Sequence, residues 1–221
     1  MMRFFLALTL VLALACSSRK SDVDYWEERA EKHGARSVIN LGHAETEMDA
    51  VTRKQVGILF PILQRHLTGN EKLLLDFGSG SGRFTPALAM AIGGKAIGVD
   101  PIQKLLDLSP RAENVEYRLL PRDGRIPLDD DSVDVVWISL VLGTITQDAD
   151  LRMAIAEVER VLKDGGLLFL VENTADKPDL KHFAFRPIDE YRTIFPSIPL
   201  KHEGDYDDLG ERISIFAGRK K

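Results

Sequence analysis

The chain has 221 residues, 44% of them hydrophobic, and a formal net charge of −5. This length predicts one folded domain with an accessory segment, and the hydrophobic content supports a sizeable core. The acidic balance argues against a nucleic-acid-binding surface, which is typically basic, and favours a neutral or cationic small molecule as the partner. The single cysteine, Cys16, excludes a disulfide bond within the chain.

Residues 1–18 have the pattern of a targeting segment. Arg3 supplies a positive start to an apolar run, residues 4–15, which is shorter than the ~20 residues needed to span a bilayer. Cys16, followed by two serines, resembles the acylation site of a bacterial lipoprotein signal. Two alternatives stay open: a hydrophobic anchor that attaches the protein peripherally through residues 4–16, and a mis-assigned start codon.

Residues 19–46 form a charged segment that we call the arm. It contains two adjacent large aromatic residues, Tyr25 and Trp26, and such rings need a surface on which to pack. The arm either docks on the domain as a structural element or folds over a ligand as a lid.

A helix is predicted to follow the arm, because Thr46-Glu47-Met48-Asp49 resembles a capping box. Pro61 is expected to kink this helix, and Gly69-Asn70 is expected to end it. Its apolar face is marked by Met48, Val51, Ile58, Leu59, Ile62 and Leu63. We expect the main domain to start here and to span residues 47–221.

A strand, a glycine-rich turn and a helix follow in direct succession. Leu73, Leu74 and Leu75 predict a buried parallel strand that Asp76 closes, and a helical pattern begins after position 84. Glycines at positions 78, 80 and 82 predict a turn whose backbone a ligand can approach closely. We call residues 78–82 the glycine turn. This succession is the first unit of a nucleotide-binding α/β sheet.

A second strand, residues 95–99, ends at Asp100, 24 residues after Asp76. An acidic residue at this place is positioned to accept hydrogen bonds from both hydroxyls of a ribose. Arg83 stands where the NAD-binding fingerprint has Gly or Ala, three residues after its second glycine, so NAD is disfavoured.

The Asp-x-Gly-x-Gly-x-Gly pattern of residues 76–82 resembles motif I of the class I S-adenosylmethionine-dependent methyltransferases. A short helix around residues 103–108 and a third strand, residues 115–120, follow. Asp123 then resembles the acidic residue with which this family contacts the adenine amine, and Ile126-Pro127 resembles its Leu-Pro-like step. The alternative for Asp123 is a turn residue in front of Gly124.

The later elements continue the resemblance. A fourth strand, residues 132–138, carries Asp134, a familiar feature of the family, and Ser139 follows it. Residues 148–162 have helical spacing, and Val161-Leu162-Lys163-Asp164-Gly165-Gly166 is similar to the family's Leu-Lys-Pro-Gly-Gly step. Residues 167–172 are expected to form a fifth strand, residues 186–191 to open a helix, and residues 199–207 and 212–217 to form a final hairpin.

The resemblance covers residues 71–219. It implies an α/β fold with a Rossmann-like seven-stranded sheet, whose last strand is antiparallel and whose two faces carry helices. It also implies S-adenosyl-L-methionine as the cofactor. Cofactor contacts are then expected at Asp76, Phe77, Gly78, Ser79, Gly80, Gly82, Asp100, Pro101, Asp123, Gly124 and Ser139. Candidate substrate contacts are Tyr25, Trp26, His43 and Glu172. No cluster has the spacing of a metal site.

The function expected from this resemblance is methyl transfer to a small-molecule acceptor by direct S_N2 displacement. This chemistry requires alignment and no obligatory general base, so no catalytic residue is assigned. His33, His43, Glu172 and His182 are candidates for a base by residue type alone. Two other functions stay open: a membrane-tethered nucleotide-binding protein that has lost catalysis, and a nicotinamide-dependent oxidoreductase, which Arg83 disfavours.

The cofactor also bears on where the protein works. S-adenosylmethionine is a charged metabolite of the cytosol that does not cross a bilayer unaided. We therefore expect the domain on the cytosolic side, with residues 4–16 as a peripheral membrane attachment. The alternative is an exported lipoprotein acylated at Cys16.

Overall fold

The computed structural model describes residues 21–221, and the predicted targeting segment, residues 1–18, lies outside the described residues. A seven-stranded sheet in the order β3-β2-β1-β4-β5-β7-β6 forms the centre of the fold. β7 runs antiparallel to β5, which confirms the predicted sheet with its antiparallel last strand. The strands are β1 (Leu73–Phe77), β2 (Lys95–Asp100), β3 (Val115–Leu119), β4 (Val133–Ser139), β5 (Leu162–Asn173), β6 (Lys201–Asp208) and β7 (Glu211–Arg219).

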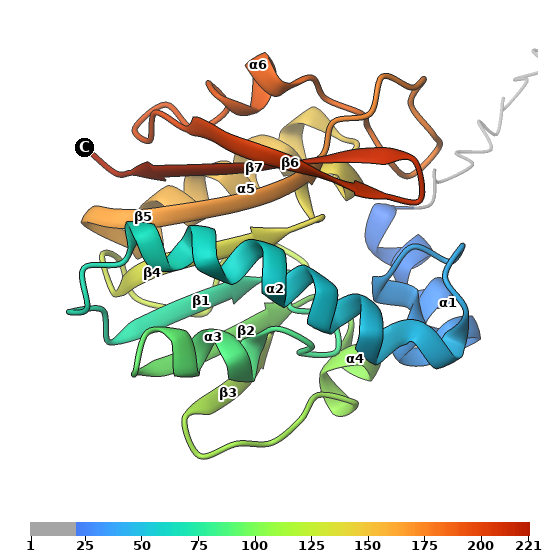
Figure 1. Ribbon diagram of the computed structural model, residues 1–221, viewed down its shortest axis with the longest axis horizontal. Coiled ribbons are helices and arrows are strands. Elements are labelled where there is room, and N and C mark those ends of the chain that lie inside the picture. Colours follow the sequence, from blue (N-terminus) through green and yellow to red (C-terminus); the bar gives the residue numbers. More distant parts are fainter. Residues whose placement is uncertain (1–20) are drawn as a thin grey trace, which may run out of the picture.

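Helices cover both faces of the sheet (Figure 1). One face packs against α2 and α3, and the other packs against α5. The helices are α1 (Asp22–His33), α2 (Met48–His66), α3 (Thr85–Ala91), α4 (Gln103–Asp107), α5 (Asp148–Val161) and α6 (Ile188–Tyr191), with 3₁₀ turns η1 (Gly34–Val38), η2 (Glu45–Glu47) and η3 (Leu142–Thr144). Because the central parallel strands are buried on both faces, they are continuous apolar runs rather than alternating ones.

The aromatic centre of the core lies on the α2 and α3 face. Trp137 in β4 is fully buried and stacks on Phe169 of β5 with ring centroids 4.9 Å apart. Phe60 of α2 and Phe84 meet the same indole edge to face, at 5.8 and 5.6 Å. These rings fix α2 on the sheet and so fix the approach of the arm that precedes it.

Three predicted boundaries differ from the structure. Glu47 is the N-cap residue of α2 and makes no side-chain cap bond to that helix; its Oε2 instead accepts from Ala44 N at 2.8 Å at the start of η2, and Thr46 lies inside η2. α2 continues through Pro61 and ends at His66, before Gly69-Asn70. β5 begins at Leu162, five residues earlier than predicted, because Leu162 pairs with Val133 ahead of the apolar run.

The described part of the arm, residues 21–46, contains the helix α1 and the 3₁₀ turn η1 and lies near the carboxyl ends of the parallel strands (Figure 1). Ser21 caps α1: its Oγ accepts from Asp24 N at 3.1 Å, and Asp24 Oδ2 accepts from Ser21 N at 3.1 Å. Within residues 21–221 no helix has both the length and the apolar character that crossing a bilayer requires.

Candidate active site

The glycine turn joins β1 to α3 at the carboxyl edge of the sheet. Gly78 N and Ser79 N both donate to Val99 O of β2, at 2.8 and 3.1 Å, so the turn folds back over the neighbouring strand. Gly78, Gly80 and Gly82 have φ angles of +74°, +56° and +70°. These left-handed conformations favour glycine, which explains why glycine recurs at alternate positions.

Asp100 fastens the glycine turn to β2. Its Oδ2 accepts a hydrogen bond from Gly80 N at 2.8 Å, and its Oδ1 accepts one from Ile102 N at 2.9 Å. Burial raises the pKa of this carboxyl to about 6, against the lowering effect of the two backbone donors. A carboxylate has about four acceptor sites, so the predicted ribose contact remains compatible with these two bonds.

Asp76 ties β1 to the first turn of α3. Thr85 Oγ1 donates to Asp76 Oδ2 at 2.6 Å, and the Asp76 side chain is buried. Burial raises the pKa of Asp76 to about 7, while Thr85 and the guanidinium of Arg83 act in the opposite direction. The carboxyl of Asp76 is therefore protonated at pH values far above its ordinary pKa of 3.8.

The raised pKa of Asp76 predicts how stability depends on pH. The folded state holds the Asp76 proton to higher pH than the unfolded state does. The stabilisation of the fold by this protonation is therefore fully present below pH ~4 and is lost as pH rises through ~7. We expect Asp76→Asn to gain about 3–4 kcal/mol of unfolding free energy relative to the wild type between pH ~4 and ~8. Urea unfolding of both proteins at the two pH values measures this difference. The prediction is contradicted if the unfolding free energy of the wild type increases relative to that of Asp76→Asn as pH rises.

Two buried hydroxyl groups beside the glycine turn have no hydrogen-bond partner within residues 21–221. They are Ser79 Oγ in the turn itself and the phenol oxygen of Tyr117 on β3. A Cβ on Gly82 would meet the Tyr117 ring, and one on Gly98 would lie 2.8 Å from Ser79 Oγ. Unpaired buried hydroxyls are costly unless a ligand or water uses them. Together with Asp100 they form a donor and acceptor set that fits the polar end of a nucleoside cofactor.

The arm covers the glycine turn. A Cβ on Gly80 would lie 2.6 Å from Val38 Cγ1, at the end of η1. Ala30 of α1 is buried with Ile102 and Leu105, and Trp26 and Val38 pack against this cluster. Tyr25 stacks on His182, with ring centroids 4.2 Å apart. The predicted packing of Tyr25 and Trp26 on the domain is therefore present, and their contact with a substrate stays a prediction.

Glu172 holds the loop after β4 in place. It is fully buried, and its Oε1 accepts from Val141 N at 2.9 Å and from Leu142 N at 2.7 Å. Its Oε2 accepts from Gly143 N at 3.3 Å. A Cβ on Gly78 would meet the Val141 side chain, so this loop lies directly against the glycine turn. The Glu172 carboxylate thus accepts hydrogen bonds from the backbone of residues 141–143.

His43 is the other predicted substrate residue, and it pairs with Asp208 at the end of β6. Its Nε2 lies 2.7 Å from Asp208 Oδ1, and both side chains are largely buried. Beside this pair lies a polar cluster in which Arg83 Nη1 donates to Gln55 Oε1 at 2.5 Å and Gln55 Nε2 donates to the Tyr206 hydroxyl at 3.3 Å. The arm and the last hairpin thus meet next to the glycine turn.

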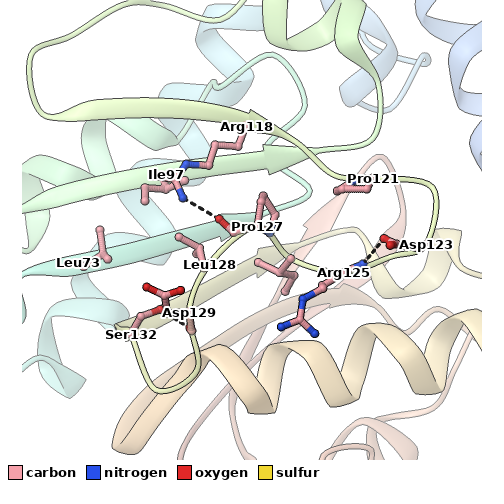
Figure 2. Close-up of a pocket in the computed structure, with 11 residues that line it drawn as sticks. Leu73, Ile97, Arg118, Pro121, Asp123, Arg125, Pro127, Leu128, Asp129 and Ser132 are labelled. Atoms are coloured by element: carbon pink, nitrogen blue, oxygen red, sulfur yellow. Dashed lines mark hydrogen bonds between the residues drawn. The ribbon is translucent and has the colours of Figure 1, made fainter.

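Asp123 lies in the exposed loop between β3 and β4. Its Oδ1 accepts from Arg125 N at 3.0 Å, and Gly124 has a φ of +77°. These are the features of the turn alternative; the adenine contact stays a prediction. Figure 2 shows Asp123 at one end of a pocket of about 530 Å³, which extends along the sheet to Leu73 at the start of β1.

The remaining predicted cofactor residues lie at the carboxyl ends of the parallel strands. The side chain of Phe77 belongs to the core, Pro101 is half-buried directly after β2, and Ser139 is the half-buried last residue of β4. No group of three or more His, Cys, Asp or Glu side chains in residues 21–221 could hold a metal ion.

Two residues that reach this site from a distance could not be predicted from the sequence. Val38 and Tyr117 contact the glycine turn from the arm and from β3, and nothing local in the sequence marks them. The helix α1 was also missed, although Ser21 and Asp24 have the spacing of a capping box. That signal could have predicted the helix.

Comparisons with known proteins agree with this geometry. A family model described as a methyltransferase domain matches residues 75–170. An uncharacterized methyltransferase of Mycobacterium tuberculosis is 40% identical over 104 residues, which cover 47% of this chain and 41% of that protein. A demethylmenaquinone methyltransferase of Lactobacillus johnsonii is 30% identical over 142 residues, which cover 61% of this chain and 56% of that protein. The chain spans about half the length of the curated relatives it matches.

Solved structures share the whole fold. Magnesium protoporphyrin IX methyltransferase from Synechocystis, solved with bound SAH (S-adenosylhomocysteine), aligns with a TM-score of 0.68 at 14% identity, covering 90% of this chain and 97% of that chain. A [4+2]-cyclase aligns with a TM-score of 0.63 at 16% identity over the same shares of the two chains. The sheet order, the glycine turn and the matching family model identify a class I S-adenosylmethionine-dependent methyltransferase domain over residues 75–170.

Proposed function

We propose that the protein transfers a methyl group from S-adenosylmethionine to a small-molecule acceptor. One observation carries the proposal: Asp100 fastens a left-handed glycine turn at the carboxyl edge of the sheet, and the arm covers that turn. In open α/β sheets ligands bind at this edge. A donor and acceptor set at the turn and an apolar cover above it suit a ligand with a charged end and an aromatic base.

The cofactor supplies an electrophilic methyl group carried on a sulfonium, so the chain has to bind, align and shield. The backbone of the glycine turn and the Ser79 hydroxyl would hold its polar end, and Asp100 would accept from the ribose. Trp26 and Val38 would exclude water from above. Holding the two reactants in line supplies a large part of the rate enhancement in such a displacement.

The small size of the acceptor is part of the proposal. Supporting it are the acidic charge of the chain and the packing of the arm across the glycine turn. Relatives include proteins named demethylmenaquinone methyltransferase and malonyl-[acyl-carrier protein] O-methyltransferase. Because the cofactor is cytosolic and charged, we place the reaction on the cytosolic side.

Turnover tests the proposal. The full chain is incubated with methyl-labelled S-adenosylmethionine and a panel of phenols, thiols, amines and carboxylic acids, and labelled products are identified by mass spectrometry. We expect labelled product and one S-adenosylhomocysteine formed for each methyl transferred. Saturable cofactor binding without transfer to any acceptor in the panel would instead favour a binding protein that has lost catalysis.

A further inference from the structure

Arg83, the residue that follows the glycine turn, has one edge of its guanidinium free. Its Nη1 donates to Gln55 Oε1 at 2.5 Å and to Thr52 Oγ1 at 3.5 Å, both on α2. Among the hydrogen bonds and ion pairs of residues 21–221, none involves its Nε or its Nη2. These two groups form the side of the planar guanidinium that can hold both oxygens of a carboxylate by parallel hydrogen bonds.

The neighbours of Arg83 fix the direction of this free edge. The guanidinium carbon lies 4.1 Å from the centre of the Phe84 ring. Gln55 is buried within the apolar face of α2, and its Nε2 donates to the Tyr206 hydroxyl at 3.3 Å. A buried amide is unfavourable unless its hydrogen bonds are made, and these two bonds account for Gln55 at this place. Because an amide carries no charge, Gln55 orients Arg83 without neutralising it.

The charge of Arg83 has no ion partner among the described side chains. Asp76 and Asp208 act on it electrostatically, but both carboxylates are engaged elsewhere. Asp76 accepts from Thr85 at 2.6 Å, and Asp208 lies 2.7 Å from His43. The side chain of Arg83 is only partly buried, yet the loss of water around it lowers its pKa to about 10, so it stays charged at neutral pH. A poorly hydrated charge is unfavourable without an opposite charge, and an anionic ligand would supply one.

Arg83 and Asp100 approach the glycine turn from different sides. Asp100 ends β2, whereas the contacts of Arg83 lead through α2 and Tyr206 to β6, which lies on the other side of β1 in the sheet order. A ligand that extends across the turn can therefore contact both. The negative charge of Asp208 disfavours a phosphate, which carries more charge than a carboxylate.

We propose that the free edge of Arg83 binds a carboxylate of a ligand at the glycine turn. The site itself rests on the contacts of Arg83. The source of the carboxylate, which is either the amino-acid end of the cofactor or the acceptor, rests on the proposed function. The two sources are tested separately.

Calorimetric titration of the full chain tests the cofactor as the source. S-adenosylhomocysteine is compared with its decarboxylated analogue, which keeps the nucleoside, the sulfur and the amino group. We expect the wild type to bind S-adenosylhomocysteine roughly 10- to 100-fold more tightly. Arg83→Met should abolish this preference, whereas a purely structural role would weaken both ligands equally. Arg83→Lys keeps the charge without the planar edge and should retain only part of the preference; it decides the outcome if Arg83→Met does not fold.

Acetate and benzoate, each compared with its amide, test the acceptor as the source. They are titrated into the full chain with and without saturating S-adenosylhomocysteine. If the preference for S-adenosylhomocysteine over its analogue does not depend on Arg83, we expect the carboxylates to bind more tightly than the amides and to lose this preference in Arg83→Met. The proposal is overturned if Arg83→Met changes neither preference.

Arg53→Met is the matched control, because Arg53 is exposed on the same helix as Gln55. It removes the same charge and should leave both preferences unchanged. If it reduces them as Arg83→Met does, the effect comes from net charge and the assignment of Arg83 is wrong. An Arg83-dependent preference for acetate or benzoate without any S-adenosylhomocysteine binding supports the carboxylate site and contradicts the proposed function, so the two failures are distinguishable.

Discussion

Glu172→Ala is expected to lower the free energy of unfolding by about 3–5 kcal/mol. The change leaves three backbone N–H groups, those of residues 141–143, without the carboxylate that accepts from them. Each unsatisfied buried donor costs roughly 1–3 kcal/mol, and partial relaxation of the loop recovers some of the total. Denaturant unfolding followed by far-ultraviolet circular dichroism measures the loss.

Glu172→Gln is the matched variant for this prediction. It keeps the shape of the side chain and one carbonyl oxygen, which can still accept from Val141 and Leu142. We expect about half the loss or less, because burial of a charge is avoided while two bonds remain. Equal stability of Glu172→Ala and the wild type would show that the loop after β4 does not depend on this carboxylate.

Gly80→Val is expected to weaken S-adenosylhomocysteine binding at least ~100-fold while the domain stays folded. Valine at a φ of +56° is strained by about 1–2 kcal/mol, and its Cβ would lie 2.6 Å from Val38 Cγ1. The side chain therefore both distorts the turn and displaces the arm. Calorimetric titration gives the affinity, and the melting temperature reports whether the fold survives.

Gly57→Val provides the control for this prediction. Gly57 lies in α2 with helical backbone, and a Cβ there would meet nothing within 4 Å. This variant should bind as the wild type does and should be as stable or slightly more stable, since glycine is unfavourable inside a helix by ~1 kcal/mol. Equal affinities for the Gly80 and Gly57 variants would remove the glycine turn from the binding site.

The sequence predicted the sheet and the glycine turn because both depend on local patterns. The apolar runs of β1, β4 and β5 are typical of strands buried on both faces. Glycine recurs at 78, 80 and 82 because the backbone there has positive φ angles. The antiparallel last strand came from the family resemblance.

The predictions were less complete where contacts join distant parts of the chain. Val38 over Gly80, and Glu172 beneath the loop after β4, depend on packing that no short pattern encodes. Asp123 matched a family position, yet its carboxylate accepts from Arg125 N within its own turn. Local hydrogen bonding by Asp competes with longer-range roles, and the sequence alone does not decide between them.

We propose that the glycine turn and Asp100 bind the nucleoside of S-adenosylmethionine. Calorimetric titration of S-adenosylhomocysteine and, separately, of NAD into the full chain at neutral pH tests it most directly. We expect saturable binding of one S-adenosylhomocysteine per chain, its loss in Gly80→Val, and no heat of binding with NAD. Saturable binding of NAD, or the absence of S-adenosylhomocysteine binding to the folded wild type, would contradict it.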